Sequence, residues 1–248
     1  MNKRSLSIFF FIFLFAGLAL AKKVGPIDAA LNIPGMLSSP QFSNNIQIII
    51  SLGLISLVPF FLLSVTSFLR IIIVFSLLRT AIGTQQVPPN SVLVGLALFM
   101  TIFIMSPVIQ EINTTAVIPY NQGRISQAKA FQNGMKPLSM FMLKQTREKD
   151  LALFVQFAKI SPPKTPDQVP IYVLIPSFMI SELKTAFQIG FLLFIPFIII
   201  DLVVANILLS LGMFMLSPVM VSLPFKILLF VLVDGWNLIT RGLLMSFR

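Results

Sequence analysis

The sequence predicts an all-α, polytopic membrane protein with two long apolar helical hairpins and a helical middle region between them. Apolar residues make up 56% of the 248 positions and charged residues only 10%, whereas soluble domains carry about 25% charged residues. The mean hydropathy is +0.95. Glycine and proline separate the chain into apolar segments, which run over residues 46–65, 91–109, 185–208 and 225–239.

The composition also excludes several functions. The chain has no cysteine and no histidine, so it lacks the usual zinc ligands and the common Ser-His and Cys-His nucleophile arrangements. We therefore expect neither an enzyme nor a bound cofactor or metal. The net charge of +10 does not predict nucleic-acid binding, because the basic residues are spread thinly around apolar segments instead of clustering with aromatic ones.

The first 21 residues have the order of a secretory signal peptide. Lys3 and Arg4 precede the apolar run 8–15, and small residues lead to a cleavage site expected between Ala21 and Lys22. A retained first membrane helix is the alternative, although this apolar stretch is shorter than the roughly 20 residues that a span needs. Cleavage would place residue 22 onward outside the cytoplasm, with residues 22–45 an irregular periplasmic segment.

Residues 46–109 are predicted to form the first apolar hairpin. The apolar run beyond residue 65 continues to Leu78 and should end at Gly83, before Pro88. Arg70 and Arg79 interrupt it nine residues apart, about 2.5 helical turns, which puts them on different faces near the two helix ends. An arginine on an apolar helix snorkels, pairs or lines water, so these two are either interfacial anchors or assembly contacts.

Residues 110–184 form the polar middle region, expected as helical and on the periplasmic side. Its excess of basic residues does not oppose that side, because loops beyond roughly 60 residues are translocated largely regardless of charge. A helix is predicted over 137–159, with proline-rich breaks at 162–166 and 170–176. Its apolar residues Phe141 and Phe154 pack either on the membrane helices or on another subunit.

Residues 185–248 are predicted to form the second apolar hairpin, with a non-helical crossing around 212–218. Asp201 and Lys226 are isolated charges on its opposite arms, and we expect them to pair because either charge buried alone would be costly. Glu182 and Lys184, just before this hairpin, fit either a solvated helix start or an intersubunit contact.

Several runs of this sequence resemble the FliP family of type III export-gate proteins, which has flagellar and injectisome members. They are residues 66–79, Gly83-Thr84-Gln85-Gln86-Val87-Pro88-Pro89-Asn90, Phe225-Lys226 and Val231-Leu232-Val233-Asp234-Gly235-Trp236. The resemblance implies about five copies of the chain in a helically arranged pore complex. The implied partners are FliQ, FliR, FlhA, FlhB, unfolded substrate proteins and membrane lipid, in the inner membrane at the flagellar basal body.

The resemblance also gives the stretch around Met213, Phe214 and Met215 the role of a gasket that closes the pore. Flexible thioether side chains suit a seal that must yield to varied chains, although Phe214 makes this one stiffer. Two other classes compete with an export gate. A small-molecule or ion transporter would also bury Asp201, and an intramembrane aspartyl protease would use Asp201 together with Asp234.

Overall fold

A computed structural model describes residues 52–53, 55–84, 86–161, 163, 165 and 168–247. The described residues divide after Leu62 into two compact units. The predicted signal segment, its cleavage site between Ala21 and Lys22, and the predicted irregular segment 22–45 all lie outside the described residues.

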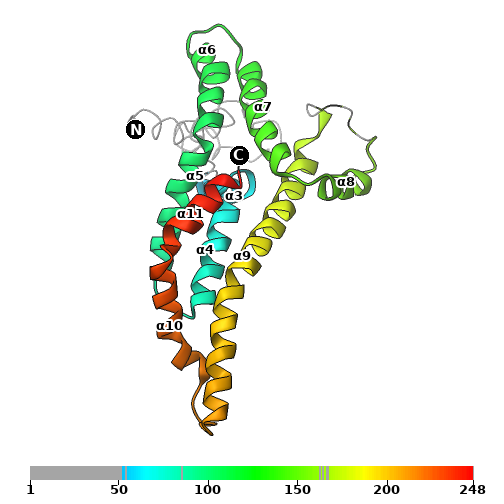
Figure 1. Ribbon diagram of the computed structural model, residues 1–248. Coiled ribbons are helices and arrows are strands. Elements are labelled where there is room, and N and C mark those ends of the chain that lie inside the picture. Colours follow the sequence, from blue (N-terminus) through cyan, green and yellow to red (C-terminus); the bar gives the residue numbers. More distant parts are fainter. Residues whose placement is uncertain are drawn as a thin grey trace, which may run out of the picture. The chain divides into compact units, whose positions relative to one another are not determined.

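Every regular element in the described part of the chain is a helix, which confirms the predicted all-α fold (Figure 1). The elements are α3 Val58–Val65, α4 Phe68–Ile82, α5 Asn90–Ile112, the π-helix η2 Asn113–Val117, α6 Ile118–Asn121, α7 Gln127–Gln145, α8 Glu148–Phe157, α9 Ile171–Ser210, α10 Pro218–Leu232 and α11 Gly235–Met245.

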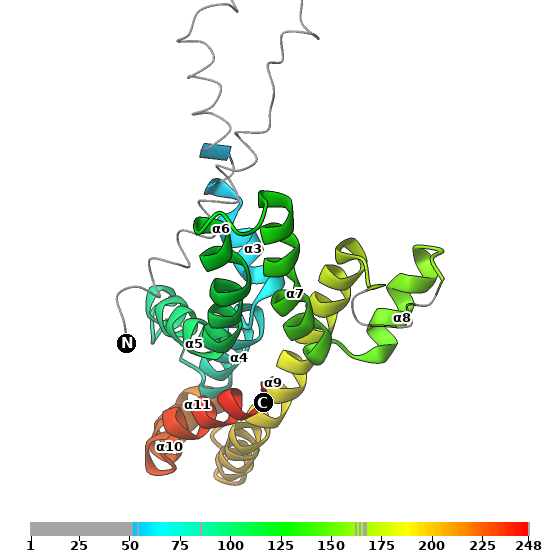
Figure 2. The same ribbon diagram turned by 90° about the horizontal axis from the view of Figure 1, so that it is seen from above.

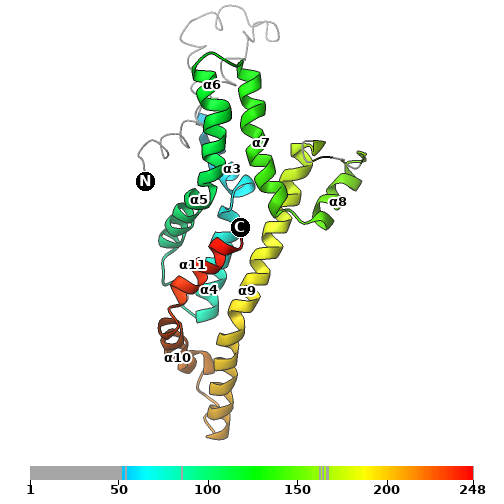
Figure 3. The same cartoon turned by 45° about the horizontal axis from the view of Figure 1, so that its top comes forward.

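The 40-residue helix α9 organises the unit that follows residue 62. Helices α4, α7, α8 and α10 all pack against it (Figures 1 and 3). Pro170 precedes its first turn as the N-cap, while Pro176 and Pro196 lie inside it. The predicted break over 170–176 is therefore wrong beyond Pro170, because a proline inside a helix removes one hydrogen bond without ending a helix that its neighbours support.

Helix α4, the first arm of the first hairpin, ends where the sequence predicts. Gly83 adopts φ 88° as the C-cap of α4, and its N–H donates to the Thr80 carbonyl at 3.1 Å. Only glycine takes this left-handed conformation without strain. After a short loop, α5 begins at Asn90 and packs back against α4.

The second arm of this hairpin does not stop at residue 109. One helical stretch runs from Asn90 to Asn121, because the π-turn of η2 joins α5 to α6 without a break. Helix α7 then folds back against η2, with Gly134 lying close to Ala116 and the Asn133 amide donating to the Thr115 carbonyl at 3.0 Å. The predicted boundary at 109/110 therefore falls inside a helix.

The predicted helix 137–159 is two helices, α7 and α8, separated at Thr146 and Arg147, whose backbones are extended. Tertiary hydrogen bonds explain the break. The Arg147 N–H donates to Ser181 Oγ at 3.0 Å, and that hydroxyl donates to Asp150 Oδ2 at 2.6 Å. These bonds fix α8 against α9, where Figure 2 shows it projecting to one side of the long helix.

The last two helices meet at a 63° bend. Asp234 adopts the left-handed conformation there (φ 49°), and Gly235 follows it directly against the Phe230 ring. Trp236 packs edge-on against Phe230 and against Phe75 of α4, with ring centroids 5.5 and 6.1 Å apart. The bend thereby returns α11 toward α4.

Two described helices are long and apolar enough to cross a membrane, Asn90–Asn121 and Ile171–Ser210. The pairs α3–α4 and α10–α11 meet the same criterion if each bent pair counts as one span, which raises the number to four. Only 17% of the apolar window in the α9 helix is buried inside the chain. The polytopic architecture is thus confirmed, and much of its apolar surface faces outward.

We expect Gly235→Ala to destabilise the chain. An added Cβ would lie 2.2–2.8 Å from three atoms of the Phe230 ring, and overpacking of this kind costs about 1–3 kcal/mol. Gly242→Ala on the same helix is the matched control, since nothing lies within 4 Å of its Cβ position. Thermal unfolding in detergent should show a lower midpoint for the first variant only; equal midpoints would contradict the close contact.

Candidate functional site

The polar centre of the protein is the guanidinium of Arg70, which lies on α4 and is only 2% exposed. All five of its N–H groups can be matched to acceptors. Nε donates to Glu182 Oε2 at 2.9 Å, Nη2 donates to Glu182 Oε1 and to Gln145 Oε1, and Nη1 donates to the carbonyl and the hydroxyl of Ser246 at 2.9 and 3.0 Å. A buried arginine is stable only when its donors are satisfied in this way.

These contacts join four parts of the chain that are far apart in sequence. Glu182 belongs to α9 and is 0% exposed, Gln145 ends α7, and Ser246 follows α11. The Phe247 ring covers the guanidinium, 3.8 Å from its central carbon to the ring centroid. We call Arg70, Glu182, Gln145, Ser246 and Phe247 the arginine cluster.

The arginine cluster changes two interpretations drawn from the sequence. Arg70 is not an interfacial anchor, and it is not exposed for the predicted assembly contact, because its side chain is buried and bonded inside its own chain. Glu182 is not part of a solvated helix start, because it lies well inside α9 and is fully buried. Gln145, Ser246 and Phe247 could not be identified from the sequence, since no local pattern connects them to an arginine up to 177 positions away.

Asp201 and Lys226 lie together on facing helices. Lys226 Nζ on α10 donates to Asp201 Oδ2 on α9 at 2.6 Å, and Ser222 Oγ donates to Asp201 Oδ1 at 2.5 Å. The lysine side chain is 4% exposed and the aspartate side chain 30%. The ammonium group also lies about 4.0 Å from the Cβ position of Gly83, so the pair sits beside the C-terminal end of α4.

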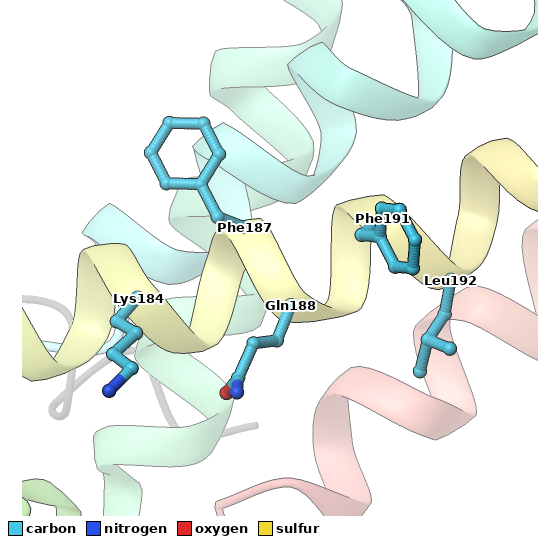
Figure 4. A pocket seen from close by; sticks show the side chains of 5 residues that line it. All are labelled: Lys184, Phe187, Gln188, Phe191 and Leu192. Carbon is cyan, nitrogen blue, oxygen red and sulfur yellow. The ribbon is translucent and has the colours of Figure 1, made fainter.

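Arg79 and Lys184 are placed differently from Arg70 and Glu182. Arg79 Nη1 donates to Asn90 Oδ1 at 2.6 Å and braces the loop between α4 and α5. Lys184 is exposed on α9 and lines an open pocket of about 620 Å³. Figure 4 shows that the other lining residues come from the same helix; they are Phe187, Gln188, Phe191 and Leu192.

The two aromatic residues that the sequence indicates as packing contacts in the middle region differ in how deeply they are buried. Phe141 is buried, with its ring 6.1 Å from Phe178 and stacked 6.4 Å from Phe247. Phe154 is half-buried on α8, the helix that packs against α9. Phe141 therefore packs within its own chain, and only Phe154 keeps a partly free surface for a neighbour.

The turn between α9 and α10 exposes Met213, Phe214 and Met215, which are 43%, 77% and 100% exposed. Gly212 (φ 73°) ends α9 in a Schellman motif: its N–H donates to the Leu209 carbonyl at 3.0 Å, and the Met213 N–H donates to Leu208 at 2.9 Å. We call residues 213–215 the gate turn. Its large apolar side chains project from the chain without contacts that would bury them.

Among the described residues, no group of three or more His, Cys, Asp or Glu side chains could hold a metal ion. The acidic groups of the long helix α9 instead form ion pairs inside the chain. The fold and these sites define a polytopic helical membrane protein whose described residues include two internal ion pairs and an exposed apolar turn.

The chain belongs to the FliP family, whose model matches residues 51–243. It is 51% identical to the flagellar biosynthetic protein FliP of Bacillus subtilis (strain 168) over 217 residues, which cover 88% of this chain and 98% of that protein. It is 51% identical to FliP of Pectobacterium carotovorum subsp. carotovorum over 87% of this chain and 86% of that protein. FliP of Aquifex aeolicus (strain VF5) is 50% identical, with 83% and 87% covered.

We expect Glu182→Leu to lower the free energy of unfolding by about 3–5 kcal/mol, because it leaves a buried guanidinium without its counter-ion. The double variant Arg70→Met, Glu182→Leu should lose much less, since it removes both charges. Lys184→Met, at an exposed cation two positions along α9, serves as the control and should change little. Denaturant titration in detergent measures all three; a double variant less stable than Glu182→Leu would contradict the pairing.

We expect Asp201→Lys to reduce strongly the amount of any complex that the chain forms in the membrane, because it places two ammonium groups together beside Ser222. The exchange Asp201→Lys with Lys226→Asp should recover part of it by restoring an opposite pair. Native gel electrophoresis of solubilised membranes gives the amount of complex. Normal assembly of the single reversal would show that the pair is dispensable.

Proposed function

We propose that this chain is a pore-forming subunit of the flagellar type III protein export gate, which passes unfolded flagellar proteins across the inner membrane. The observation that carries the proposal is family membership together with about half-identity to flagellar FliP proteins over most of the chain. Those relatives are named as flagellar proteins, which favours a flagellar role over an injectisome one.

The gate turn supports a closure role in such a pore. Three large apolar side chains at the tip of a hairpin are costly to leave in water, so they gain by meeting equivalent side chains of other subunits. Met213 and Met215 supply flexible thioethers that fill irregular space, and Phe214 adds a rigid ring. Copies of this turn around one axis would form an apolar seal that a passing chain could displace.

The same proposal assigns partners and location. Further copies of this chain, FliQ, FliR, FlhA and FlhB would assemble with it in the bacterial inner membrane at the flagellar basal body, with residues 110–184 toward the periplasm. The outward-facing apolar surface of α9, of which few side chains are buried inside the chain, supports extensive contact with other subunits and with lipid. Phe154 and Lys184 lie on surfaces available for such contacts.

The arrangement of Asp201 argues against an aspartyl protease. An aspartyl protease needs two carboxylates that share one proton. Here the Asp201 carboxylate accepts hydrogen bonds from Lys226 and Ser222, while Asp234 is exposed at the bend between α10 and α11. We therefore assign Asp201 to holding the second hairpin together.

Replacing Met213, Phe214 and Met215 with glycine should make membranes that contain the assembled gate leaky to small ions, because the seal loses its apolar side chains. Replacing the same three residues with leucine is the control, since it keeps apolar bulk. Ion flux into inverted membrane vesicles measures both. Tight vesicles with the glycine variant in assembled complexes would rule out closure at the gate turn.

A further inference from the structure

The segment that follows α11 reaches the buried side chain of Arg70. Ser246 is the C-cap of α11, and Phe247 follows it. Both contact Arg70, which lies 176 and 177 positions earlier. These contacts connect the segment after α11 to a helix near the other end of the described residues.

Ser246 supplies two of the five acceptors of the guanidinium. Its carbonyl and its hydroxyl both receive hydrogen bonds from Arg70 Nη1, at 2.9 and 3.0 Å. Glu182 and Gln145 satisfy the other N–H groups. Without Ser246, one entire nitrogen of a side chain that is 2% exposed would have no partner in the described part of the protein.

Phe247 covers one face of the same guanidinium group. Its ring lies 3.8 Å over the guanidinium carbon and is stacked on Phe141 of α7, with 18° between the ring planes. Its carbonyl accepts a bond from Gln145 Nε2 at 3.5 Å. The ring therefore shields the ion pair from water, which strengthens the attraction between Arg70 and Glu182.

We propose that Ser246 and Phe247 form a C-terminal latch, a conformational device that closes the arginine cluster and locks α4, α7 and α9 together. Arg70, Gln145 and Glu182 all precede Ser246 and Phe247 in the sequence, so this site closes only when the segment after α11 docks. With the latch undocked, water reaches the guanidinium and weakens its bonds to Glu182 and Gln145, which connect α4 to α9 and to α7. Through Arg70, the packing of the middle region against the membrane hairpins thus depends on Ser246 and Phe247.

The latch does not rest on the proposed export function, because it concerns the closure of a single chain. Its test accordingly measures stability, not motility or ion flux. If the truncation lowers the stability of the chain, the latch stands even if the chain has another function. If the truncation leaves the stability unchanged, the latch is refuted even if the chain does form an export gate.

The test compares the full-length chain with a chain that ends at Met245, both purified from membranes in the same detergent. We expect the shortened chain to unfold about 5–10 °C lower, because a buried charge loses two hydrogen bonds and its cover. Met245→Ala is the matched control, since this neighbouring side chain is 53% exposed, and its midpoint should stay close to that of the full-length chain. An unchanged midpoint for the shortened chain would overturn the proposal.

The same truncation in the Arg70→Met, Glu182→Leu background separates a latch from general loss of a helix end. If the latch acts through the guanidinium, removing it from this background should cost less than half as much; an equal loss in both backgrounds would overturn the proposal. Phe247→Leu in the full-length chain keeps apolar bulk but removes the ring over Arg70. If the shortened chain does not accumulate, Phe247→Leu can be compared in the same two backgrounds. An equal drop of the unfolding midpoint in both would refute the latch.

Discussion

A buried guanidinium needs hydrogen-bond acceptors for its five N–H groups. At Arg70, this requirement determines how α4, α7, α9 and the segment after α11 pack together. Glu182, Gln145 and Ser246 meet it from α9, from α7 and from the segment after α11. Hydrophobic contacts are tolerant of small displacements, whereas these bonds fix both direction and distance. In a chain that is 56% apolar, the arginine cluster can therefore specify how otherwise similar apolar helices are positioned relative to one another.

The Asp201–Lys226 pair acts on the second hairpin in a related way. It joins α9 to α10 directly, and the ammonium group lies close to Gly83 at the end of α4. The Arg70–Glu182 pair attaches the long helix to α4, and the Asp201–Lys226 pair attaches it to α10. Between them, the exposed surface of α9 stays largely apolar, which suits contact with lipid and with other subunits.

Local backbone conformation, and not an ion pair, determines the position of the gate turn. Helix α9 ends before Gly212, which adopts the left-handed conformation. Helix α10 begins at Pro218, a position where the backbone N–H has no partner within the helix. Between them, Met213, Phe214 and Ser217 make the backbone hydrogen bonds of the turn. A short, sharp turn that carries apolar side chains is able to meet other copies while the ion pairs keep its two supporting helices in place.

The sequence by itself determined the helical membrane class, the end of α4 at Gly83 and the non-helical crossing near Gly212, because composition and glycine act locally. It also placed Asp201 and Lys226 on opposite arms, where burial demands a partner. Only the tertiary structure decided that α9 continues through Pro176, that the helix predicted over 137–159 is interrupted at Thr146, and that Arg70 pairs with Glu182 beside Phe247. Those outcomes depend on contacts between distant segments, whose free energy no local pattern contains.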